Sequence, residues 1–475
     1  MARRTLAVAA LTGGLVLSLS ASGAPAVSRA APTPGAEGIG DAYFPRDGNG
    51  GIDVLAYDIH DRYGFATGRL SGFTRLTVRA TKDLSSFNLD FLLDVPAGGV
   101  KVDGVAAAIT RPVRHELQID PATDILAGRT FRVRVDYVDQ PGRYSYAGES
   151  NWLADANEVV AMNEPHMAPW WFPSNDHPRD KARMDIHVTV PKANQVIANG
   201  QLVGRTVRNN LATVHWRAAE PMAPYNAFFA AGSFTVDHGI SRGLPWYVAA
   251  SKGIPTAQRG VAMNMLRRTP TFVRWLQSQL GPYPFSTTGG VVTSLNPGFS
   301  LENQTRPTYP GLGRASTSLM VHELSHQWLG DSVSVQNWRD IWLNEGAATF
   351  MEHRYAETHG RRTAHAWMMG RYNGTPRGDQ FWKLRIGDPG AARMFDFRIY
   401  LRGGMALQAL RQRIGNADFW SVMRSWVRSN RIGNGSTREF RALAERISGA
   451  NLNGFFDAWF FTPAKPARTR ANGLR

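Results

Sequence analysis

The spacing of apolar residues changes near Gly239, and this change constrains the fold more than any other feature of the sequence. Before it, short runs such as residues 73–78 and 185–190 alternate apolar and polar side chains. That period of two is typical of strands that bury one face. After it, apolar residues recur three and four positions apart over residues 256–280 and 343–359. This second pattern indicates helices that pack on one side.

The chain is long enough for two domains, because its 475 residues exceed the roughly 100 to 200 of a usual domain. We predict an α+β fold, with an antiparallel β-rich domain over residues 51–239 and a mostly helical domain over residues 240–462. Residues 32–50, rich in Ala, Pro and Gly, predict a flexible lead-in. Residues 463–475, basic and broken by prolines, predict a flexible tail.

The first residues have the pattern of an export signal. Two arginines precede an apolar run over residues 6–17, and small residues suited to cleavage follow. The run is shorter than the ~20 residues that a membrane span needs, and no later segment reaches that length. We expect a cleaved signal peptide over residues 1–31 and a secreted protein without stable membrane insertion. A retained anchor is the alternative.

The composition limits which metal ligands, nucleophiles and partners the chain can have. The chain has no cysteine, which excludes disulfides, thiolate nucleophiles and cysteine-bound metals, so any metal must be held by histidines and carboxylates. The net charge of +16 is spread along the chain and forms no basic stripe with interleaved aromatic residues. Solvated surface charge therefore explains it better than a nucleic-acid partner. The sequence gives no prediction of oligomeric state.

One short motif predicts a metal centre. His322 and His326 lie four residues apart on a predicted helix, so both imidazoles project from one face and can bind one ion. Glu323 lies beside the first of them and can act as a general base on a water at the metal. Glu345, eighteen residues beyond His326, supplies the third protein ligand that a catalytic zinc site needs. The structural alternatives are a chance pairing of histidines and an acidic partner of a helix dipole.

The motif at residues 322–326, together with Asn-Glu-Gly at residues 344–346, resembles the zinc aminopeptidases of peptidase family M1, the aminopeptidase N family. The resemblance extends over nearly the whole mature chain, to residues 455–459. It implies a saddle-like β-rich domain, a thermolysin-like catalytic domain and one Zn²⁺ ion. Longer members of the family continue into a large helical domain. The resemblance implies that this chain lacks that domain and has an open cleft.

The resemblance also implies residues that bind the substrate. Residues 299–303 stand where the family has Gly-Ala-Met-Glu-Asn, which makes Glu302 the anchor of the substrate's free amino group. Phe299 replaces a small residue of that motif, so the first subsite departs from the family's shape. Glu164 falls where the family keeps a Gln or Glu that helps to bind the amino terminus. A loop glutamate that caps a turn is the alternative for Glu164.

Tyr400 resembles the tyrosine that the family places before a Lys-Gly pair, with Arg402 in the position of the lysine. In that role its phenol would donate a hydrogen bond to the developing oxyanion. The expected function is therefore a zinc aminopeptidase that cleaves peptides with a free N-terminus. The alternatives are a zinc endopeptidase with the same metal site and a catalytically silent peptide-binding protein on this scaffold.

Overall fold

The computed structural model describes residues 1–2, 5–10 and 30–475. Most of the predicted signal peptide lies outside the described residues. Residues 1–31 and residues 32–475 form separate units, and the fold below is that of the second unit. Among the described residues, no helix has both the length and the apolar character needed to cross a bilayer.

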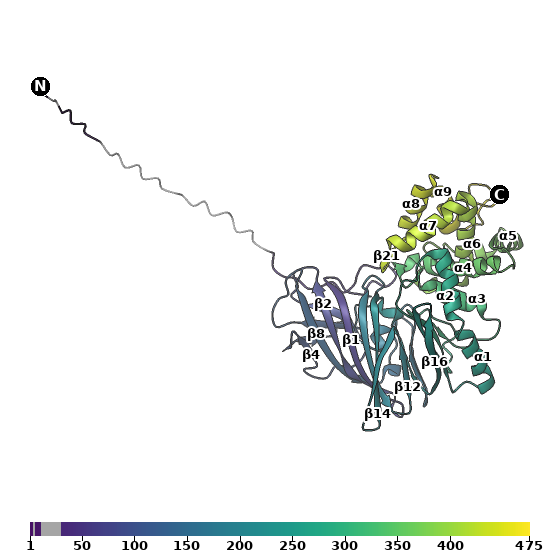
Figure 1. The fold of residues 1–475 in the computed structure, drawn as a ribbon, viewed down its shortest axis with the longest axis horizontal. Helices are drawn as coiled ribbons and strands as arrows, with labels where there is room; N and C mark the ends of the chain where they lie inside the picture. Colours follow the sequence, from purple (N-terminus) through teal and green to yellow (C-terminus); the bar gives the residue numbers. More distant parts are fainter. Residues whose placement is uncertain (3–4, 11–29) are drawn as a thin grey trace. The chain divides into compact units, whose positions relative to one another are not determined.

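A large sheet dominates the first half of the chain (Figure 1). Its side chains alternate between buried and accessible along the inner strands, as the period of two predicts. Its neighbours pair antiparallel except β1 and β11, which pair parallel. In spatial order its eight strands are β13 (Gln201–Arg208), β14 (Leu211–Met222), β11 (Ala182–Pro191), β1 (Ile52–Gly64), β2 (Arg69–Ala80), β8 (Thr130–Asp139), β4 (Val100–Val102) and β5 (Val105–Ala106).

Smaller sheets complete the β-rich part. One has the order β12 (Gln195–Ala198), β15 (Phe229–Gly232), β10 (Val159–Ala161) and β9 (Trp152–Ala154). Another has the order β3 (Phe87–Asp90), β7 (Glu116–Asp120) and β6 (Ala108–Thr110). A third consists of β16 (Phe234–Ser241), β17 (Leu244–Ser251), β18 (Thr288–Val292) and β19 (Thr308–Tyr309). The boundary that we expected after residue 239 falls inside β16, because β16 forms a hairpin with β17.

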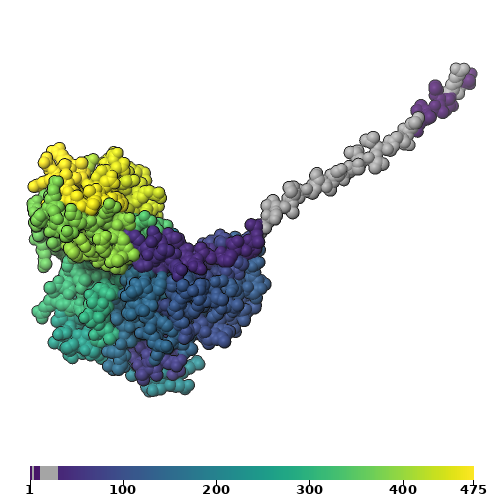
Figure 2. Space-filling view, turned by 180° about the vertical axis from the view of Figure 1, so that it is seen from behind, coloured from purple at the N-terminus to yellow at the C-terminus, as the bar shows by residue number. Residues whose placement is uncertain are grey.

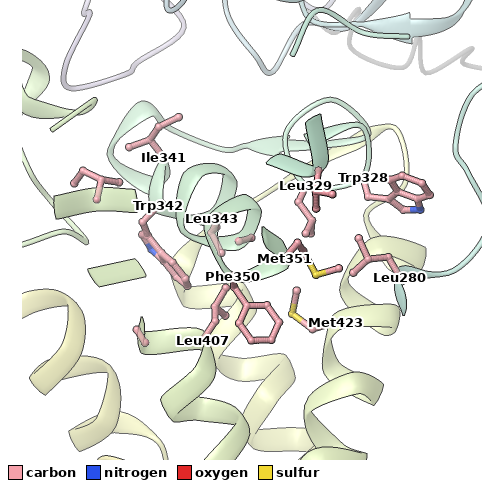
Figure 3. Close-up of a cluster of buried hydrophobic side chains, with 14 of the residues drawn as sticks. Leu280, Trp328, Leu329, Ile341, Trp342, Leu343, Phe350, Met351, Leu407 and Met423 are labelled. Carbon is pink, nitrogen blue, oxygen red and sulfur yellow. The ribbon is translucent and has the colours of Figure 1, made fainter. Parts of the chain in front are cut away.

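The second half of the chain is mainly helical, as predicted. Its helices are α1 (Thr256–Leu266), α2 (Thr269–Leu280), α3 (Thr317–His326), α4 (Trp342–Thr358), α5 (Ala364–Gly374), α6 (Phe397–Ile414), α7 (Asn416–Ser429), α8 (Thr437–Ser448) and α9 (Asn453–Phe456). A short parallel pair, β20 (Val333–Val335) with β21 (Gly433–Gly435), joins its early and late parts. Helix α4 packs between α3 and α6. Trp342 and Phe350 of α4 belong to one buried hydrophobic cluster with Leu407 of α6 (Figure 3).

The prediction of a flexible lead-in at residues 32–50 is wrong. Gly35 donates a backbone hydrogen bond to Ser86 at 2.8 Å, and the Asp41 carboxylate accepts one from the backbone of Trp338 at 2.8 Å. Asp47 is buried and contacts His166. Figure 2 shows this purple segment lying along the surface from the blue β-rich part to the green helical part. Its composition resembles that of a linker, but partners far away in the sequence hold it.

The prediction of a flexible tail at residues 463–475 is also wrong. Lys465 donates hydrogen bonds to the carbonyls of Tyr372 and Thr375 at 2.7 and 2.8 Å. The Trp459 indole donates to the carbonyl of Asn472 at 3.1 Å, and Leu474 is buried. The prolines do end regular helix, but the tail is held by contacts of Lys465, Asn472 and Leu474.

Candidate active site

A single cavity of about 520 Å³ brings together all the residues that the sequence indicated. Its walls come from α3, from the start of α4, from the start of α6 and from two loops of the chain before α3. The predicted residues that line it are Glu164, Glu302, His322, Glu323, His326, Glu345 and Tyr400.

The two histidines and Glu345 converge as metal ligands would. His322 and His326 lie one turn apart on α3, and Glu345 lies in the first turn of α4. Their side chains meet at Glu345 Oε2, 3.1 Å from His322 Nε2 and 3.5 Å from His326 Nε2. Two ligands that are each about 2.0–2.1 Å from one tetrahedral ion lie about 3.3 Å apart. The three side chains therefore fit a single zinc ion and leave a side open to the cavity.

The neighbouring histidines keep the Glu345 carboxylate ionised although it is buried, and the ionised form is the one that binds a metal. Burial opposes ionisation of Glu345, but the neighbouring His326 and His322 outweigh it and hold the pKa of Glu345 at about 2. The charges of Glu302 and Glu345 in turn raise the pKa of His326 to about 10 against the effect of burial. A cation between them would take over the role of the imidazolium protons, because metal ligands bind in deprotonated form.

Glu352 belongs to the site and was not among the predicted residues. Its Oε1 lies 2.8 Å from His322 Nδ1, and its Oε2 accepts a hydrogen bond from Ser318. A carboxylate on the far nitrogen of a ligating imidazole fixes the tautomer and orientation of the ring. The signal was present in the sequence, since Glu352 follows Glu345 by seven residues and so lies on the same helix face two turns later.

Glu323 is buried beside His322 and faces the cavity. Burial raises the pKa of Glu323 to about 8, partly opposed by His322 and His326. Oxygen atoms of Glu323 and Glu302 lie within 4.8 Å of each other and of a nitrogen of His326. A carboxylate with a pKa near neutrality can both accept and return a proton.

Glu302 and Glu164 form an acidic wall of the cavity. One oxygen of each, Oε1 in both cases, is buried without a hydrogen-bond partner in the described part of the chain. Burial raises the pKa of Glu302, and burial together with the charges of Glu302 and Glu345 raises that of Glu164. Gln327, directly after α3, donates to the carbonyl of Glu302 at 2.9 Å and so fixes the loop that carries it. These free oxygens suit a cationic ligand.

Tyr400 stands in the first turn of α6 with its ring 5.9 Å from that of His322 and nearly parallel to it. Burial and the carboxylates Glu345 and Glu164 raise its pKa well above the usual value of a phenol. The hydroxyl therefore stays neutral and can donate a hydrogen bond. At the rim, Phe299 and Phe395 remain 40% and 36% exposed and line the cavity. The sequence gave no indication of Phe395.

Two family models match the chain. Residues 311–459 match the peptidase family M1 domain, and residues 137–225 match the peptidase M1 N-terminal domain. The first contains α3, α4 and α6, while the second contains the loop of Glu164.

Solved structures share this architecture. A mutant of an M1 zinc metallopeptidase from Deinococcus radiodurans, bound to a Tyr-Ser-Ala substrate, superposes with a TM-score of 0.79 at 27% identity, over 91% of this chain and 100% of that one. A two-domain M1 zinc metallopeptidase mutant bound to L-tryptophan gives a TM-score of 0.80 at 27% identity, over 90% and 100%. The prediction of a β-rich domain followed by a helical catalytic domain is confirmed.

Curated relatives are more distant and longer. A leucyl aminopeptidase of Saccharolobus solfataricus is 23% identical over 89% of this chain and 55% of its own length. The Tricorn protease-interacting factor F2 of Thermoplasma acidophilum is 22% identical over 83% and 54%. Aminopeptidase M1-C of rice is 23% identical over 67% and 38%. The chain thus spans less than two thirds of the length of these relatives.

Proposed function

The chain belongs to peptidase family M1, and from this membership and the geometry of the cavity we propose that it is a zinc-dependent aminopeptidase. It would remove the first residue from peptides that have a free N-terminus. The observation that carries this proposal is the pair Glu302 and Glu164. Their unpartnered buried oxygens lie in the same cavity as the histidines and Glu345.

His322, His326 and Glu345 would hold the zinc ion, because two imidazoles and one carboxylate are a usual donor set for catalytic zinc. When bound, such an ion supplies Lewis-acid polarisation of a carbonyl and lowers the pKa of a water molecule. Glu352 would keep the His322 ring oriented through its contact with Nδ1.

Glu323 would act as the general base. Its carboxylate faces the cavity from the helix that carries both histidines, within reach of a water molecule there. It would accept a proton from the attacking water and return that proton to the leaving amine. A nearby dication favours the ionised carboxylate and so lowers the pKa of Glu323 from the value that burial alone imposes.

Tyr400 would donate a hydrogen bond to the oxyanion that forms at the scissile carbonyl, since its phenol stays neutral. Glu302 and Glu164 would bind the α-ammonium group of the substrate through charge-assisted hydrogen bonds. That contact places the scissile bond one residue from the N-terminus. It also disfavours acetylated and internal peptides, whose amide nitrogen carries no charge.

The test is a panel of fluorogenic aminoacyl substrates, assayed with and without a chelator. We expect the wild type to cleave free substrates, to lose activity with the chelator and to regain it with Zn²⁺. The Glu323→Gln variant controls for contaminating peptidases, because it keeps the metal ligands and loses the base. Equal hydrolysis of acetylated and free peptides would favour the endopeptidase alternative. Equal activity of wild type and Glu323→Gln would show that the activity comes from a contaminant, and it would favour the alternative of a silent peptide-binding protein.

We further propose that the protein is exported with cleavage of its first residues, on the basis of the signal-like pattern in residues 1–31. Amino-terminal sequencing of the protein recovered from culture medium tests this. A mature N-terminus close to residue 32 is expected. Recovery of the full-length chain from the cells alone would contradict it.

A further inference from the structure

A second group of metal-binding side chains lies in the β-rich part, outside the active-site cavity. Asp90 ends β3, Glu116 begins β7 and His115 directly precedes it. Asp90 and Glu116 are paired directly opposite each other in the β3–β7 ladder. All three residues are at most 5% exposed, and each offers a ligand atom within 4.8 Å of the other two. Like charges placed opposite each other on neighbouring strands are destabilising unless something lies between them.

One atom of each of these three side chains has no hydrogen-bond partner in the described part of the chain. They are Asp90 Oδ1, His115 Nε2 and Glu116 Oε1. His115 Nε2 lies 3.3 Å from Glu116 Oε1, a contact that is an ion pair when the histidine is protonated. Buried polar atoms in folded proteins nearly always have a hydrogen-bond partner. Three atoms without one in a single group therefore indicate a ligand that the described residues do not supply.

The opposite atoms of the same carboxylates are firmly held. Asp90 Oδ2 accepts hydrogen bonds from the backbone of Asp176 at 2.7 Å and from the Asn49 amide at 3.1 Å. Glu116 Oε2 accepts one from the Asn88 amide at 3.0 Å. Each carboxylate is thus fixed through one oxygen, while its other oxygen has no hydrogen-bond partner among the described residues. Outer contacts of this kind orient the ligands in protein metal sites.

The number of buried carboxylates in this region also favours a bound cation. Asp176 is buried next to Asp90, and its Oδ2 has no partner among the described residues either. The nearby His166 already pairs with Asp47 at 2.5 Å. Removing an unpaired carboxylate from water is energetically unfavourable. A divalent ion would offset two of these negative charges.

Of the three residues, His115 lies nearest to the surface and lines a cavity. A second cavity of about 520 Å³ reaches His115, between the lead-in at Tyr43 and Phe44 and the loop of Tyr146.

We propose that Asp90, His115 and Glu116 bind a divalent transition-metal ion, for which Zn²⁺ is the probe. One imidazole nitrogen with two carboxylate oxygens is a donor set that zinc accepts. Through Asn49 the ion would also fasten the lead-in to the β3–β7 sheet, in a chain that has no disulfide to do so. The site is independent of the peptidase centre.

The test measures the number of zinc ions bound per full-length chain. Protein stripped with a chelator is dialysed against Zn²⁺, and bound metal is measured by mass spectrometry. We expect two zinc ions per wild-type chain and one in Glu116→Gln, which keeps its peptidase activity. The matched control is Asp120→Asn in the same strand, whose side chain contacts Gln118 and lies outside the group. It should keep both ions.

A proton shared between Asp90 and Glu116 is the rival explanation. It predicts one zinc ion in wild type and in Glu116→Gln alike, and that result overturns the proposal. Zinc-edge anomalous diffraction from wild-type crystals distinguishes a bound ion from a shared proton even if Glu116→Gln does not fold. A peak between Asp90, His115 and Glu116 supports the site, and a peak at the active site alone refutes it. Absence of the active-site peak would instead contradict the proposed function.

Discussion

Gly346 of α4 and Gly403 of α6 lie backbone against backbone. A Cβ added at Gly346 would come within 2.7 Å of the Gly403 Cα, and one added at Gly403 within 2.8 Å of the Gly346 Cα. No other residue allows two helices to approach so closely. Gly346 directly follows Glu345, and Gly403 lies one turn after Tyr400. The contact therefore sets the distance between the predicted third metal ligand and the predicted oxyanion donor.

Replacing Gly346 with alanine should force α4 and α6 apart. We expect Gly346→Ala to lower the free energy of unfolding by about 1–3 kcal/mol, as other overpacked interiors do. We also expect a fall in kcat of up to about 10²-fold, because displacement of Glu345 or Tyr400 by 1 Å is enough for such a loss. Thermal unfolding and steady-state kinetics measure the two effects.

Gly260 provides the matched control for this change. It lies within α1, and a Cβ built there meets nothing within 4 Å. Gly260→Ala should be neutral or stabilise the protein by up to about 1 kcal/mol, because alanine favours helix. Equal behaviour of the two variants would mean that the α4–α6 contact is not tight.

Removal of the Tyr400 hydroxyl tests the oxyanion role. Tyr400→Phe keeps the ring that lies against His322 and loses only the donor. We expect kcat to fall by about 10²–10³-fold with little change in KM or zinc content. Tyr355→Phe on α4 is the control, since that ring packs on Trp275 away from the cavity. Wild-type kcat in Tyr400→Phe would remove Tyr400 from the mechanism.

The sequence predicted those parts of the site that depend on local spacing. His322 and His326 face the same way because they are four residues apart on a helix, whatever surrounds that helix. Glu345 was predicted from its distance in sequence and from the need for a third ligand. The structure places all three side chains in one cavity. Glu352 was missed although its spacing from Glu345 pointed to it.

The parts that the sequence did not predict depend on contacts between remote residues. Arg402 is one example, because it was noted only as a departure from the family's lysine. It is fully buried and donates to the carbonyls of Trp382, Leu384, Ala458 and Thr462. Arg402 also donates to the carbonyl of Ala464 in the tail at 3.4 Å. No periodicity in a Pro- and Arg-rich segment can reveal which carbonyls will surround a guanidinium.

Glu352 leads to a prediction about metal affinity. In Glu352→Gln the charged partner of His322 Nδ1 becomes a neutral amide. We expect zinc to bind about 10–100-fold more weakly, as loss of such outer contacts usually causes. Activity should recover when Zn²⁺ is raised, which competition with a chelator measures. Glu357→Gln, on the same helix but paired with Arg411, should bind zinc as wild type does. Unchanged affinity in Glu352→Gln would contradict the orienting role.

Asp61 leads to a prediction about pH and stability. Its side chain lies under the large sheet, 4% exposed, and accepts hydrogen bonds from the Trp171 indole at 2.6 Å and the Tyr137 hydroxyl at 2.8 Å. Among the described residues no cation pairs with it. Burial raises the pKa of Asp61 to about 7, partly opposed by these hydrogen bonds.

The native protein therefore binds a proton at Asp61 more tightly than the unfolded chain, whose carboxyl has the usual pKa of 3.8. Between these two values the free energy of unfolding falls as pH rises, by up to about 1.4 kcal/mol per pH unit from this group, and above pH 7 the effect levels off. Asp61→Asn removes that dependence. Its amide can accept from Trp171 and donate to Tyr137, whose hydroxyl can turn to Thr74 at 3.0 Å. Urea unfolding from pH 4.5 to 8 should give a flatter curve for Asp61→Asn, with the variant more stable than wild type above pH 7. Parallel curves would show that Asp61 is ionised in the folded protein throughout this range.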